Sequence, residues 1–112
     1  MKTKLVHCQK ENYDVLIDRR TKWGNPYSLH HTLTLDEAKY LGAVHREGGS
    51  ITRADAIALY EWYLRNNQEL LNDLESLRGL TLGCWCKPQA CHGDVILKLL
   101  DETEDKSDLF EY

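Results

Sequence analysis

The chain has no apolar run that approaches the roughly 18 residues a membrane-spanning helix needs. Its first residues, MKTKLVHCQKENYD, also have no apolar stretch of the length that a secretory signal requires. These absences argue against a membrane role and predict a cytoplasmic protein whose four cysteines stay reduced. We therefore expect thiol chemistry or metal binding of the cysteines rather than disulfide bonding.

The chain also shows no internal repeat and no linker that would divide its 112 residues, a length that suits one domain with its own core. The formal net charge is −4, but residues 101–112 hold six acidic residues and one lysine, which leaves +1 for residues 1–100. Charge therefore does not exclude nucleic acid as a partner. We expect a single domain over residues 1–100 and an acidic tail over residues 101–112.

Three short stretches rich in branched and aromatic residues predict strands, at residues 4–8, 13–19 and 80–86. Only the polar QKEN separates the first two stretches, so we expect these two strands to pair with each other through a turn. The third stretch, LTLGCWC, is nearly continuous in apolar residues, which is typical of a buried strand.

Helices are predicted between and after these strands. Thr34 with Glu37, and Thr52 with Asp55, have the spacing of capping boxes that begin helices, and the first of these helices should end in the glycine pair at residues 48–49. Leucines at helical spacing predict a further helix over residues 68–79. The same kind of pattern predicts a last helix over residues 91–102. The order predicts a small α/β domain with a sheet of about three strands and helices packed against it.

The stretch LGCWCKPQACHGD holds three of the four cysteines. On a strand, Cys84 and Cys86 would point to one side and Trp85 to the other, and the short KPQA loop would return Cys91 and His92 to the end of that strand. Free N–H groups at the start of the following helix attract anions and lower the pKa of a nearby thiol.

Three interpretations of this stretch are open. Cys84, Cys86, Cys91 and His92 are a suitable donor set for zinc, but their spacing is not that of a structural zinc site. Alternatively, Cys86 or Cys91 is a nucleophile or a ligand contact, with His92 or Asp94 as general acid or base. The third interpretation is a set of buried cysteines with a capping histidine.

Two motifs, YDVLIDRRTKWGNPY and LGCWCKPQACHGDVI, resemble the family named domain of unknown function 4326, which occurs in bacteria and bacteriophages and carries no settled activity. The resemblance covers nearly the whole chain, with the helical ADAIALYEWYL between the motifs. The first motif commonly reads Ile-Gly-Arg in the family, where this chain has Ile17, Asp18 and Arg19.

The resemblance implies two groups of motif residues, Tyr13, Arg19, Lys22, Trp23, Gly24, Asn25 and Pro26 in one and Cys84, Cys86, Pro88, Cys91, His92, Gly93 and Asp94 in the other. Both groups follow predicted strands, and loops at the carboxyl ends of strands share the edge where an α/β sheet usually has its ligand crevice.

In such a crevice, Arg19 and Lys22 can bind phosphate, Trp23 can stack on a base and Asn25 can read its edge. The structural alternative is that Trp23 fills the core, Asn25 forms a turn and the two cations are solvated.

From the sequence we expect a small enzyme or ligand-binding protein that acts on a phosphorylated, nucleotide-like or nucleic-acid substrate. The alternative is a noncatalytic interaction module, zinc-stabilised or cysteine-rich, such as a phage protein that binds a host factor. The sequence names no cofactor, since zinc is only an alternative, and it fixes no oligomeric state.

Overall fold

The computed structural model describes residues 2–109, with side chains through residue 103. The elements in chain order are β1 (Lys4–His7), β2 (Val15–Leu16), α1 (Leu35–Leu41), α2 (Arg53–Arg65), α3 (Gln68–Asp73), the 3-10 helix η1 (Leu74–Leu77), β3 (Thr81–Cys84) and α4 (His92–Leu109). The chain is thus an α/β fold with a three-stranded sheet, as the sequence predicts.

The sheet has the order β1-β3-β2, and both pairings are parallel. The prediction that the first two strands pair with each other is wrong, because β3 lies between them. Burial explains the order: Leu82, Gly83 and Cys84 of β3 are all buried, whereas β1 and β2 are only partly buried and suit the two edges.

Both predicted capping boxes are present. The Thr34 side chain accepts from the Glu37 N–H while the Glu37 carboxylate accepts from the Thr34 N–H, and Thr52 and Asp55 make the same exchange. The first helix ends at Gly42 rather than at the predicted glycine pair, because Gly42 has a φ of 71°, which ends a helix and which glycine adopts without strain.

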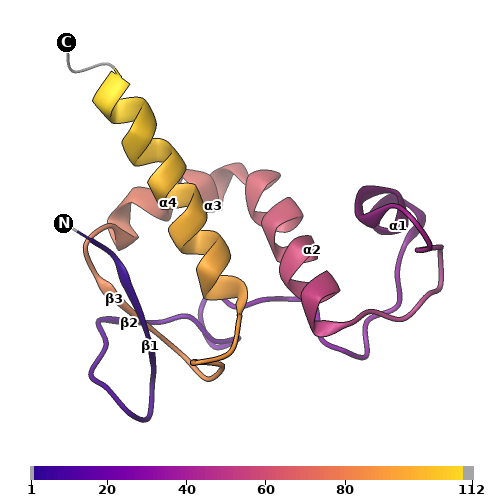
Figure 1. The fold of residues 1–112 in the computed structure, drawn as a ribbon, viewed down its shortest axis with the longest axis horizontal. Coiled ribbons are helices and arrows are strands. Elements are labelled where there is room, and N and C mark those ends of the chain that lie inside the picture. Colours follow the sequence, from indigo (N-terminus) through magenta and orange to yellow (C-terminus); the bar gives the residue numbers. More distant parts are fainter. Residues whose placement is uncertain (1, 110–112) are drawn as a thin grey trace.

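The main core lies between the sheet and the helices α2 to α4. α4 packs against α2, β1 and η1, and Figure 1 shows it crossing beside the sheet, while α1 lies at the far end of the molecule, against α2. Buried residues of the main core include Ile17, Tyr60, Leu64, Leu82 and Ile96. A second, smaller core joins α1 to α2.

The helix α4 continues past residue 100, through most of the predicted acidic tail. Arg65 of α2 pairs with Glu102 of this extension, with Nη2 at 2.9 Å from Oε1. The last three residues of the tail lie outside the described part of the chain. Among residues 2–109, no helix is long and apolar enough to cross a membrane.

Candidate functional site

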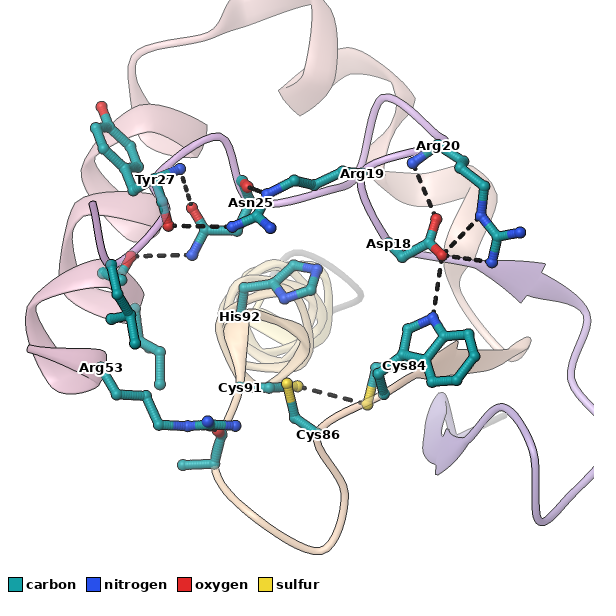
Figure 2. Close-up of a pocket in the computed structure, with 15 residues that line it drawn as sticks. Asp18, Arg19, Arg20, Asn25, Tyr27, Arg53, Cys84, Cys86, Cys91 and His92 are labelled. Atoms are coloured by element: carbon teal, nitrogen blue, oxygen red, sulfur yellow. Dashed lines mark hydrogen bonds and ion pairs between the residues drawn. The ribbon is translucent and has the colours of Figure 1, made fainter. Parts of the chain in front are cut away.

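A pocket of about 400 Å³ lies where the two sequence motifs meet, beyond the carboxyl ends of β2 and β3 (Figure 2). It is lined by Asp18, Arg19, Arg20, Asn25, Tyr27, Leu29, Arg53, Ala56, Ile57, Cys84, Trp85, Cys86, Ala90, Cys91 and His92. Three arginines and one aspartate give this lining a formal charge of +2. Apolar walls with a few convergent polar groups are typical of sites for small organic ligands, and the charge favours an anion.

Arg19 forms one wall of the pocket. Its Nε donates to the Asn25 carbonyl oxygen at 2.9 Å, and its Nη2 lies 3.5 Å from the Tyr27 carbonyl oxygen. Asn25 in turn bonds through its side chain to the Ala56 carbonyl and to the Tyr27 N–H, at 3.1 and 2.9 Å. The side-chain amide of Asn25 therefore holds the loop against α2, and its backbone carbonyl orients Arg19.

Arg53 forms the opposite wall, and sequence reasoning missed it. It is the first residue of α2, and its Nε donates to the Ala90 carbonyl oxygen at 3.1 Å. Its two Nη groups make no hydrogen bond with any described residue. No local pattern marks this arginine, because only the packing of α2 beside the second motif brings it to the pocket.

Asp18 joins the two motifs. Its Oδ2 accepts from Arg20 Nε and Nη2, at 2.9 and 2.6 Å, and from the indole N–H of Trp85 at 3.1 Å. The bond with Arg20, assisted by that with Trp85, lowers the pKa of Asp18 to about 2. The ionised Asp18 thus compensates Arg20 and fixes Trp85, a residue that is 49% exposed, at the pocket.

His92 lines the pocket with a fixed tautomer. Its Nε2 lies 2.6 Å from the Ile17 carbonyl oxygen, so Nε2 carries the proton and Nδ1 holds the lone pair. The ring packs edge-on against Tyr60, with centroids 4.9 Å apart. Burial, reinforced by the nearby Arg19 and only partly offset by the bond to Ile17, lowers the pKa of His92. A neutral imidazole with Nδ1 as acceptor suits a general base.

The three cysteines of the second motif differ in accessibility. Cys84 and Cys91 are 1% and 2% exposed, with their Sγ atoms 3.6 Å apart, whereas Cys86 is partly exposed and lies in the loop after β3. Burial raises the pKa of Cys91 to about 12, although the Gly93 N–H opposes this. The burial of Cys91 therefore opposes the activated thiol expected there, because desolvation acts against the helix start. Cys86 is left as the more accessible thiol candidate.

The donor set considered for zinc is not assembled. In the described part of the chain, no group of three or more His, Cys, Asp or Glu side chains is placed to hold a metal ion. Cys84 and Cys91 contact each other, but the Nε2 of His92 is bonded to a backbone carbonyl. This geometry does not favour zinc binding over a thiol that contacts the ligand or a set of buried cysteines.

Two predicted ligand contacts of the first motif lie away from the pocket. Lys22 pairs with Asp73 and does not line the pocket. Trp23 is 4% exposed in the main core, and its carbonyl oxygen accepts from the Tyr60 hydroxyl at 2.7 Å. Trp23 has no face open for stacking, and the exposed tryptophan at the pocket is Trp85.

Asp94 also lies outside the pocket lining. Its Oδ2 accepts from the Cys91 N–H and its Oδ1 from the Lys87 ammonium, both at 3.0 Å. Partial burial opposes ionisation, but these two donors together lower the pKa of Asp94. This carboxylate holds the loop to the first turn of α4, so its position favours support of the site over proton transfer.

Two motif glycines are needed for close packing. A Cβ at Gly24 would lie 2.5 Å from both the Arg19 Cα and the Asp18 carbonyl oxygen, and a Cβ at Gly93 would lie 2.6 Å from a methyl group of Leu5. Gly24 thus allows the loop to fold back under the residues that line the pocket, and Gly93 seats the start of α4 on the sheet.

Comparison with known proteins gives two matches and one negative result. Residues 2–102 match Domain of unknown function (DUF4326). The "Uncharacterized 12.4 kDa protein in nrdA-td intergenic region" of Enterobacteria phage T4 is 33% identical over 102 residues, which cover 88% of this chain and 77% of that protein. No solved structure matches the chain significantly.

Proposed function

The chain belongs to the DUF4326 family, and we propose that it is a small enzyme or ligand-binding protein whose pocket takes a phosphorylated, nucleotide-like ligand. One observation carries the proposal: Arg19, Arg20 and Arg53 converge on a pocket that also exposes Trp85 and the imidazole of His92. Both family motifs contribute to this pocket, which supports it as the functional site.

The chemistry of these side chains suits a nucleotide. Guanidinium groups bind phosphate oxygens through a planar fork of donors, and an exposed indole ring offers a face on which a base stacks. A phosphorylated sugar without a base would leave Trp85 unused. An uncharged ligand would leave the positive charge of the pocket without a partner.

A variant of His92 distinguishes an enzyme from a ligand-binding protein. Its Nδ1 has no partner among the described residues and can accept a proton from a bound ligand or from water. In an enzyme, His92→Gln abolishes turnover and keeps ligand affinity within a few-fold. In a binding protein, there is no turnover to lose.

A thermal-shift screen against nucleotides, short single-stranded oligonucleotides and inorganic phosphate tests the proposal. A ligand at 100 times its Kd adds about 2.7 kcal/mol to the free energy of unfolding. Arg53→Gln should abolish the shift, and Arg46→Gln, at an exposed arginine outside the pocket, should keep it. Failure of every ligand to stabilise the wild-type protein would contradict the proposal and favour the noncatalytic interaction module.

A further inference from the structure

We propose that the pocket takes a nucleoside monophosphate through a terminal phosphate monoester, held between Arg19 and Arg53 beside His92, with the base on Trp85. This inference rests on the proposed function and narrows its ligand class. It assigns the main specificity-determining role to Arg53, a residue outside both motifs.

Hydrogen bonds to backbone carbonyl oxygens orient Arg19 and Arg53 before a ligand binds. Each uses its Nε to donate to a carbonyl oxygen, Arg19 to Asn25 at 2.9 Å and Arg53 to Ala90 at 3.1 Å. This leaves both Nη groups of Arg53 and the Nη1 group of Arg19 without a hydrogen-bond partner among the groups that the structure describes. Figure 2 shows the two side chains on opposite sides of His92. Donors that are already oriented bind an anion at a smaller entropic cost.

The charge of the pocket matches a monoester better than a diester. Arg20 is compensated by Asp18, so the formal charge of +2 comes from Arg19 and Arg53. A phosphate monoester approaches a charge of −2 above its second pKa of about 6, whereas a diester carries −1. A monoester also presents three terminal oxygens, enough for donors that arrive from two sides.

The other end of the pocket offers the base site. The Trp85 indole N–H donates to Asp18 Oδ2 at 3.1 Å, which fixes the ring while nearly half of the residue stays exposed. Figure 2 places Asp18 across the pocket from Arg53, with His92 between them. The base can then lie at the Trp85 end and the phosphate between Arg19 and Arg53 beside His92, with the sugar between base and phosphate.

The test is calorimetric titration of the full chain with the four nucleoside 5′-monophosphates and with their 3′,5′-cyclic forms. Each pair shares base and sugar and differs in having a monoester or a diester. For the base that binds best, we expect the monoester to bind at least tenfold more tightly. Arg53→Gln should reduce this preference to threefold or less, Arg53→Lys should give an intermediate value, and Arg46→Gln should keep it. Trp85→Leu should weaken both forms in equal proportion.

The outcomes separate the inference from the proposed function. Equal affinity for the two forms, or a monoester preference that survives Arg53→Gln in folded protein, would overturn the inference and leave the proposed function standing. Binding of oligonucleotides but of no monophosphate would do the same. If no phosphorylated ligand binds in either experiment, the proposed function fails and the inference fails with it. Circular dichroism of each variant establishes that it is folded.

Discussion

Replacing Gly24 with alanine should destabilise the protein and disturb the pocket at the same time. The added Cβ would lie 2.5 Å from the Asp18 carbonyl oxygen and 2.5 and 2.7 Å from the Cα and N of Arg19, where ordinary contacts begin at 3.4 Å. All three are backbone atoms, so no side chain can rotate away. The segment that carries Asp18 and Arg19 has to move.

The magnitude follows from two opposing effects. Overpacking against backbone lowers the free energy of unfolding by about 3 kcal/mol, at the upper end of the usual range. Replacing glycine also reduces the conformational freedom of the unfolded chain, which raises the free energy of unfolding by about 0.4–1 kcal/mol. The net loss is therefore about 2 kcal/mol. For a chain of 112 residues, an unfolding entropy of about 2.1 cal/mol/K per residue converts this into a fall in Tm of roughly 8 °C.

Thermal and urea unfolding of Gly24→Ala measure this loss, with Gly48→Ala as the control. Gly48 has open space around its Cβ position but a φ of +81°, so alanine there costs about 1 kcal/mol of backbone strain without moving the pocket. Ligand affinity should fall only in Gly24→Ala. A Tm for Gly24→Ala within 3 °C of wild type would refute the reasoning about close approach.

Three further predictions concern the thiols, the pH response and the tail. Iodoacetamide should label Cys86 at least tenfold faster than Cys91, since Cys91 is buried and its pKa is raised; equal rates would contradict this. The bond to the Gly42 carbonyl, then that to Asp55, raises the pKa of His45, so its stabilising effect is full below about pH 6.5 and is lost as pH rises through the raised value. His45→Gln should therefore lower Tm more at pH 5.5 than at pH 8.5, and a pH-independent loss would exclude this cause. Removing residues 101–112 should cost about 1 kcal/mol or less in urea unfolding, because the Arg65–Glu102 ion pair, which this truncation deletes, is exposed; a larger loss would indicate docking on the core.

The local features of the fold could be predicted from the sequence because short-range interactions determine them. The capping boxes at Thr34 and Thr52 each depend on a pair of residues three apart, and both are present. Strand order is different in kind, since it depends on which strand can be buried on both faces. The continuous apolar run around Leu82 indicates a strand that is buried on both faces and therefore central. Our prediction instead paired the first two strands because the link between them is short.

The site could be predicted as a meeting of two motifs but not as a set of side chains. Loops at the carboxyl ends of neighbouring strands share one edge of the sheet, and this rule predicted that the two motifs meet. Arg19 and His92, one from each motif, line the same pocket. Residue type alone could not distinguish the buried Trp23 from the exposed Trp85, nor show that Cys91 is buried and that burial raises the pKa of its thiol. Arg53 was missed because its approach to the pocket is set by helix packing.

The most direct test of the central claim uses the indole N–H signals of the three tryptophans in an NMR titration with nucleoside 5′-monophosphates. Trp85 lines the pocket, whereas Trp23 is buried in the core and Trp62 packs against Tyr40 away from it. The account predicts a saturable shift of the Trp85 signal, little change in the other two, and loss of the shift in Arg53→Gln. A saturable shift confined to Trp62, or no shift at millimolar nucleotide, would contradict the assignment of this pocket as the binding site.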